Sequence, residues 1–170
     1  MEHQGSRGRA TDDAAGGIDE AHRRPADADD ATVEAVGKLS EAFERLERAR
    51  GRLYDFHQMV GHTDFQFGEA ADALRDAGHA DLADLVDTEV VGRNVLDGRW
   101  TFQIVEEFDD LYFEPVREIE RAVRERLMAG RRHVLEAELK DSRRTRGRLG
   151  HEARPAAAHD PRVPTERTDP

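Results

Sequence analysis

Apolar residues recur every three or four positions over two long stretches of this chain, the spacing that aligns side chains along one face of an α-helix. The first stretch places these residues on one stripe: Val33, Val36, Leu39, Phe43, Leu46, Leu53, His57 and Val60. Arg50 fills the one gap in the spacing. The pattern predicts an amphipathic helix from about Asp30 to Val60.

Helix-end signals follow this first stripe. Gly61 fits a C-terminal cap, and the four residues from Thr63 match a capping box, in which two side chains satisfy free backbone donors at the start of a helix. We therefore expect a second, separate helix over residues 63–78. A third, short helix is expected to begin at Asp81 and to end at Gly92.

The second long stripe starts at Trp100. Its apolar positions are Phe102, Ile104, Val105, Phe108, Leu111, Tyr112, Val116, Ile119, Val123 and Leu127. They predict another long helix, in which Pro115 removes one backbone hydrogen bond and causes a kink near Phe113. The alternation of Trp100, Phe102 and Ile104 leaves a short strand as the alternative for the start of this segment.

The two ends of the chain lack such a pattern. All aromatic residues fall between Phe43 and Phe113, so residues 1–30 and 148–170 offer too little apolar surface to offset the entropy of ordering. We predict that both are disordered tails, acidic at the N-terminus and rich in Pro and Arg at the C-terminus. One helical domain over residues 31–147 remains.

These elements predict an all-α fold. Residues 133–140 are expected to continue the second long helix, which frays through Arg148. The fold is then a helical hairpin or bundle of two long and two short helices. Two long helices alone bury only a thin core, so either the short helices fold back onto them or two chains pair as in a coiled coil. The homodimer is the arrangement we favour.

The charge and composition limit the environment and the partners. The formal net charge of −11 is divided as −4 for residues 1–30, −9 for residues 31–140 and +2 for residues 141–170. An acidic body disfavours nucleic acid and anionic membranes as main partners. The sequence has no cysteine, no apolar run of membrane-spanning length and no signal peptide, which predicts a soluble, cytoplasmic protein.

Catalytic motifs have little support in this sequence. No glycine-rich phosphate-binding loop is present, and the three serines, Ser6, Ser40 and Ser142, lie outside any strained turn beside a base. The sequence therefore favours a protein that is not an enzyme and that acts by association.

The richest chemistry lies in the predicted loop over residues 92–100. Arg93, Asn94, Arg99 and Trp100 combine two guanidinium groups, an amide and the only indole of the chain. Such a set can bind a protein partner or a small acidic ligand through charge-assisted hydrogen bonds and stacking. The alternative is a tight turn in which the indole plugs the end of the bundle and the arginines pair with acids such as Asp87.

A divalent metal site is the competing hypothesis. His133 and Glu136 share a helix face at i,i+3 spacing, and His57 and Asp109 lie on or beside the two long stripes, so all four could ligate a metal between helices. A carboxylate in a stripe needs a partner. For Asp109 that partner is a metal, His57 or Arg50, and a plain interhelical hydrogen bond or ion pair is the simpler explanation.

The last candidate is the arginine cluster that follows the final helix, made up of Arg143, Arg144, Arg146 and Arg148. Such a run can contact nucleic-acid phosphates with little regard to sequence. No aromatic residue is interleaved to stack on bases. A solvated tail or a contact with the acidic body of another subunit is therefore favoured over nucleic-acid binding.

Overall fold

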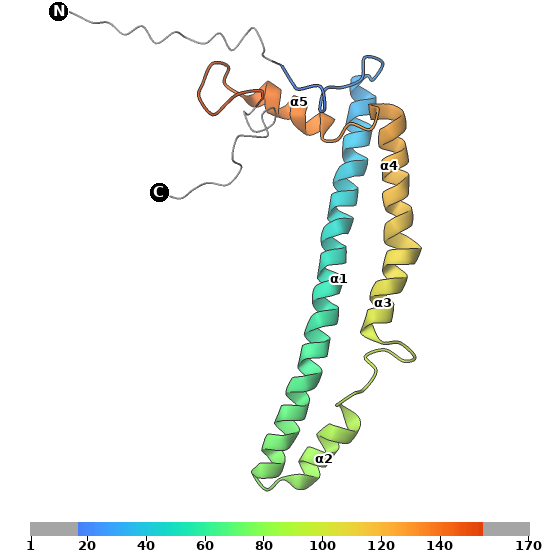
Figure 1. The fold of residues 1–170 in the computed structure, drawn as a ribbon, viewed down its shortest axis with the longest axis vertical. Helices are drawn as coiled ribbons and strands as arrows, with labels where there is room; N and C mark the ends of the chain where they lie inside the picture. The colour runs from blue at the N-terminus through green and yellow to red at the C-terminus, as the bar shows by residue number, and fades with distance from the viewer. Residues whose placement is uncertain (1–16, 155–170) are drawn as a thin grey trace, which may run out of the picture. The chain divides into compact units, whose positions relative to one another are not determined.

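The computed structural model describes residues 17–154. Its helices are α1 (Asp30–Asp76), α2 (Ala80–Glu89), α3 (Thr101–Phe108), a π-helical turn (Asp109–Phe113), α4 (Glu114–Met128) and α5 (Val134–Arg143) (Figure 1). The all-α prediction is confirmed for the described residues. Predictions about residues 1–16 and 155–170 lie outside them. The chain divides into two units, residues 39–121 and residues 17–38 with 122–154.

Helix α1 is continuous, so the predicted break at Gly61 is wrong. The Thr63 hydroxyl donates to the Met59 carbonyl at 2.8 Å inside the helix and caps no new one. Glycine in a helix interior costs only about 1 kcal/mol relative to alanine. The hydrogen bonds of the added turns offset that cost, as does the packing of Ala71, which is fully buried.

Helix α2 folds back against the end of α1. The chain reverses at Gly78, whose φ of +89° is one that residues with a Cβ rarely adopt. Ala71 of α1 and Ala83 of α2 are both fully buried, so small side chains let the two helices approach closely. The predicted third helix is confirmed, although it runs from Ala80 to Glu89 rather than from Asp81 to Gly92.

The return limb, α3 through α4, runs back along α1 within residues 39–121 (Figure 1). It is helical from Thr101, so the strand alternative is wrong. The irregularity expected near Phe113 takes the form of the π-helical turn, in which the Glu114 N–H donates to the Asp109 carbonyl. Pro115, which has no N–H to offer, follows directly and explains why regular bonding is lost here.

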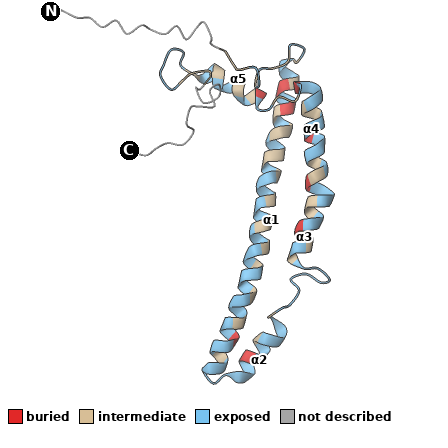
Figure 2. Cartoon of the chain, viewed as in Figure 1, coloured by how far each residue is buried: buried red, intermediate tan, exposed pale blue. Residues whose placement is uncertain are grey.

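A seam of paired side chains joins α1 to the return limb. The rings of Phe43 and Phe113 stack with centroids 5.5 Å apart, and Ser40 donates to the carboxylate of Glu120 at 2.9 Å. Few residues of the 39–121 unit are buried, and much of each helix is exposed (Figure 2). This hairpin therefore has the thin core that the sequence predicted.

The other unit has its own small core. Val33, Val36, Met128 and Val134 are buried together, with Ala28, Val123 and Leu135 packed against them. Residues 17–29 form turns beside this core. Arg24 joins them to α5 and to the start of α1, because it donates to Glu138 at 2.7 Å and to Asp30 at 2.6 Å.

Candidate functional site

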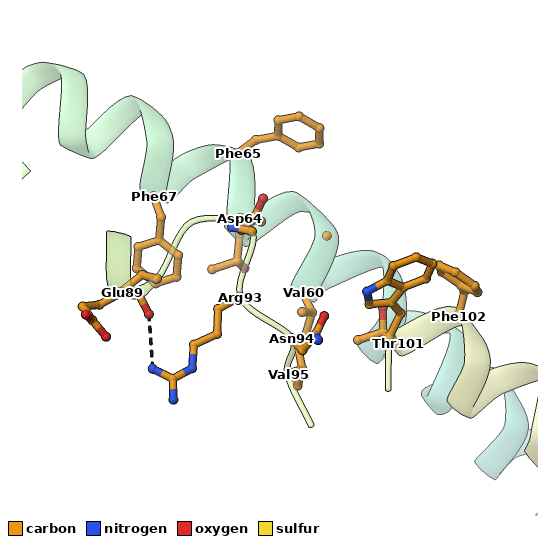
Figure 3. A pocket seen from close by; sticks show the side chains of 15 residues that line it. Val60, Asp64, Phe65, Phe67, Glu89, Arg93, Asn94, Val95, Thr101 and Phe102 are labelled. Atoms are coloured by element: carbon orange, nitrogen blue, oxygen red, sulfur yellow. Dashed lines mark hydrogen bonds between the residues drawn. The ribbon is translucent and has the colours of Figure 1, made fainter. Parts of the chain in front are cut away.

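A groove opens within the 39–121 unit, between α1, the segment that follows α2 and the start of α3 (Figure 3). Its volume is about 750 Å³. Its lining residues come from these three segments and from the last residue of α2: Val60, Gly61, Thr63, Asp64, Phe65, Phe67, Glu89, Val90, Gly92, Arg93, Asn94, Val95, Trp100, Thr101 and Phe102. The volume falls in the range of small-molecule sites, about 300–1,000 Å³.

One hydrogen bond anchors the groove wall. The Gly92 N–H donates to the Asp64 carboxylate at 2.8 Å, which holds the segment after α2 against α1. Gly92 has a φ of +72°, so the chain turns there in a conformation that suits glycine. The groove therefore depends on α1 continuing past Gly61, since a helix that ended there would not place Asp64.

The groove is lined mainly by exposed apolar side chains. The Trp100 and Phe102 rings lie 5.1 Å apart at 52°, and Trp100 remains 54% exposed. Phe67 and Val95 are exposed as well, whereas the ring of Phe65 points away from the groove in Figure 3. Trp100 is thus a groove wall and does not plug a bundle end.

Arg93 is the one cation in the groove lining. Its guanidinium donates to the Glu89 backbone carbonyl at 3.3 Å, and within residues 17–154 no carboxylate forms an ion pair with it. Arg99 differs, because it is paired with Glu107. Asp87, the acid that the tight-turn alternative pairs with the loop arginines, pairs instead with Arg75 at 2.8 Å.

The four predicted loop residues therefore separate into two groups. Arg93, Asn94 and Trp100 line the groove together. Arg99 lines an adjacent hollow, which also includes Gly98 and both Asn94 and Trp100.

Asp109 lies at the centre of the seam between α1 and the return limb. Its two carboxylate oxygens each accept a hydrogen bond from Arg50 at 2.7 Å, and one also accepts from the Tyr54 hydroxyl at 2.9 Å. The bonds from Arg50 hold the pKa of Asp109 below its usual value, although partial burial opposes them, and the Tyr54 bond adds to the effect. The same hydrogen bond to Asp109 raises the pKa of Tyr54. Of the partners considered for Asp109, Arg50 is the one found.

His57 has a different partner. Its Nδ1 lies 2.8 Å from the Thr101 hydroxyl. His57 and Asp109 belong to the 39–121 unit, whereas His133 and Glu136 belong to the other unit, at the start of α5. A metal at Asp109 would have to displace the Arg50 guanidinium, which weighs against Asp109 as a ligand. The metal site made of the four residues stays a prediction.

The C-terminal arginines are partly engaged with an acid. The Arg144 side chain is only 3% exposed and donates to Asp141 at 2.6 Å, and Arg146 lies 3.9 Å from the same carboxylate. Arg143 and Arg148 are exposed. Nucleic-acid binding by this cluster remains a prediction, with fewer available cations than the sequence suggested.

No protein-family model, curated protein or solved structure matches this chain. Among the described helices, none combines the length and the apolar character needed to cross a membrane.

Sequence reasoning missed the part of the groove that α1 contributes. The predicted helix end at Gly61 and the capping box from Thr63 place Asp64 and Phe67 in a separate helix, away from the loop over residues 92–100. The signal that could have found them is the phase of the first stripe, which continues from Val60 to Asp64 and Phe67 at three- and four-residue steps if Gly61 is kept helical.

Proposed function

We propose that this protein acts by binding rather than by catalysis, associating with itself and accepting a protein partner or a small acidic ligand at the groove beside residues 92–100. The observation that carries the proposal is Arg93. It is a guanidinium beside exposed aromatic and aliphatic side chains, and within the described residues it has no carboxylate partner.

The groove chemistry suits an anion with an apolar body. Trp100 and Phe102 offer a stacking surface, and Arg93 offers charge-assisted hydrogen bonds to a carboxylate or sulfonate. Three polar lining groups are engaged in structure: Asp64 accepts from Gly92, Thr63 bonds to the helix backbone, and the Thr101 hydroxyl lies against His57.

A pair of dyes of similar shape tests the acidic-ligand part. The intrinsic fluorescence of Trp100, the only tryptophan in the chain, is followed while the full chain is titrated with 8-anilinonaphthalene-1-sulfonate or with neutral N-phenyl-1-naphthylamine. We expect Arg93→Gln to weaken binding of the sulfonate about threefold to tenfold, which corresponds to about 0.7–1.4 kcal/mol for a solvated charged hydrogen bond. Binding of the neutral dye should be unchanged.

Arg52→Gln is the matched control, because it removes the same charge from a side chain that is 86% exposed and outside the groove. It should leave both titrations as in the wild type. If neither dye changes the Trp100 fluorescence, or if Arg93→Gln and Arg52→Gln have equal effects, the groove is not the site of acidic-ligand binding.

A further inference from the structure

A second apolar stripe runs along α1 beside the seam. Three residues directly precede seam residues and recur every seven positions: Ala42 before Phe43, Ala49 before Arg50 and Phe56 before His57. All three side chains are exposed, and the exposed fraction of Phe56 is 39%. Apolar residues at seven-residue spacing are the pattern that helices use to pack against other helices.

The return limb repeats this arrangement. Phe108 directly precedes the seam residue Asp109, and Tyr112 and Ile119 precede the buried residues Phe113 and Glu120. Tyr112 is 55% exposed and Ile119 is 60% exposed.

Both stripes lie on the same side of the hairpin. Two antiparallel helices that face each other are related approximately by a two-fold axis perpendicular to the plane that contains both. Rotation about this axis maps one helix onto the other in the same N-to-C order and keeps each side of the plane on the same side. A residue one position before the seam therefore points to the same side from either helix. We call this the six-residue face: Ala42, Ala49, Phe56, Phe108, Tyr112 and Ile119. Five of these side chains are exposed and Phe108 is half-buried, and apolar side chains exposed along one side of a helix pair are candidates for an association site.

The charges of the two helices differ sharply at the same level of the hairpin. Residues 45–52 contain four arginines and one glutamate, a net charge of +3, whereas residues 106–118 contain six acids and one arginine, a net charge of −5. The Arg50–Asp109 pair places these segments side by side within one chain. A second copy can repeat that match only if α1 of each copy lies beside the return limb of the other.

Side-chain size favours the same orientation. Ala42 and Ala49 leave room on α1, whereas Ile119 and Tyr112 are bulky and exposed at about the same levels of the return limb. Placing α1 of one copy against the return limb of the other sets large residues against small ones. Placing α1 against α1 sets small against small and arginine against arginine.

We infer that a second copy of this chain covers the six-residue face, with a two-fold axis along the helices that sets α1 of each copy beside the return limb of the other in a four-helix bundle. This inference rests on the self-association in the proposed function and names its interface. A two-fold interface needs a self-complementary surface. The size pattern of this face and the opposite net charges of residues 45–52 and 106–118, the segments that carry it, meet that condition.

Solution mass tests the interface. The full chain is expected to be a dimer by light scattering coupled to size exclusion, and Ile119→Glu is expected to raise the dimer dissociation constant at least tenfold without loss of helical circular dichroism. The matched control is Leu85→Glu, a comparably exposed leucine (56%) on α2 and outside the face, which should stay dimeric. A dimer that survives Ile119→Glu would overturn the inference.

Intermolecular label distances test the orientation. The chain has no cysteine, so Arg48→Cys, Asp55→Cys and His62→Cys, which are exposed and seven residues apart on α1, each give one spin label per chain. With the axis along the helices the three distances should agree within about 5 Å. With α1 antiparallel to α1, successive positions should differ by up to about 20 Å, since each step of seven residues moves both labels by about 10 Å.

The outcomes separate the two proposals. If the full chain is a monomer, the self-association and this inference are both overturned, even if a different protein covers the face. The dye result at Arg93 is unaffected by that outcome. A dimer whose label distances change with position overturns only the orientation inferred here.

Discussion

Replacing Arg50 with methionine is expected to lower the free energy of unfolding at pH 7 by about 2 kcal/mol. The substitution keeps much of the side-chain volume but leaves the Asp109 carboxylate, only 18% exposed, with the Tyr54 hydroxyl as its remaining bonded partner. Breaking a buried ion pair costs about 3–5 kcal/mol, and the 35% exposure of Arg50 reduces that figure. The stacking of the guanidinium over Phe113, 4.9 Å from the ring centroid, is lost too.

The loss should depend on pH in a defined direction. The pKa of Asp109 is lower in the folded protein than its ordinary value because Arg50 donates to the carboxylate. Such a group contributes stability that is present above the unfolded-state pKa, about 3.9 for aspartate, and that disappears as the pH falls through the folded-state pKa. The gap between wild type and Arg50→Met should therefore be widest near neutral pH and narrow below about pH 4.

Urea unfolding at several pH values and one fixed protein concentration measures this gap, because self-association makes stability depend on concentration. Arg52→Met is the control, since it makes the same chemical change at an exposed arginine that pairs with Asp55 on its own helix. It should cost less than about 0.5 kcal/mol. An equal loss for both variants, or a gap that does not change with pH, would contradict the role assigned to the Arg50–Asp109 pair.

The pattern of the sequence predicted that Asp109 needs a partner, but it could not choose one. Helical periodicity shows that Asp109 lies beside the apolar stripe, but it fixes the level of Asp109 relative to the other helix only to within about one turn. Both Arg50 and His57 are therefore possible partners. The choice depends on the axial register between two helices that are far apart in sequence. In the structure that register places Thr101 opposite His57 and Asp109 opposite Arg50.

Helix α1 and the groove show a different limit. The cap signals at Gly61 and Thr63 are genuine local preferences, but each is worth only about 1 kcal/mol. Distant contacts outweigh them, among them the bond from Gly92 to Asp64 and the close packing of Ala71 in the α1–α2 turn. A groove built from three separated segments is therefore seen only when α1 is continuous, whereas the loop residues Arg93 and Trp100 could be chosen from composition alone.

Replacing Met128 with alanine is the second substitution with a large expected effect. It is expected to lower the stability of the unit formed by residues 17–38 and 122–154. Met128 is 1% exposed at the end of α4 and packs with Val33, Val36 and Val134. Truncating a buried methionine removes its transfer free energy and leaves a cavity, which together cost about 2–5 kcal/mol. The core of this unit is small, so few other contacts remain to hold α5 and the turns at residues 17–29 in place.

Hydrogen exchange measured by residue is the informative readout for Met128→Ala. Amides of α5 and of the first turns of α1, which cover this core, should lose protection by a factor of about 30 or more, the equivalent of at least 2 kcal/mol. Met59→Ala makes the same chemical change at a methionine of α1 that is 61% exposed, so it should leave protection within about 0.5 kcal/mol of wild type. The two sites differ in burial, and the prediction depends on that difference. If both substitutions reduced protection equally, the Met128 cluster would not be the core that orders this unit.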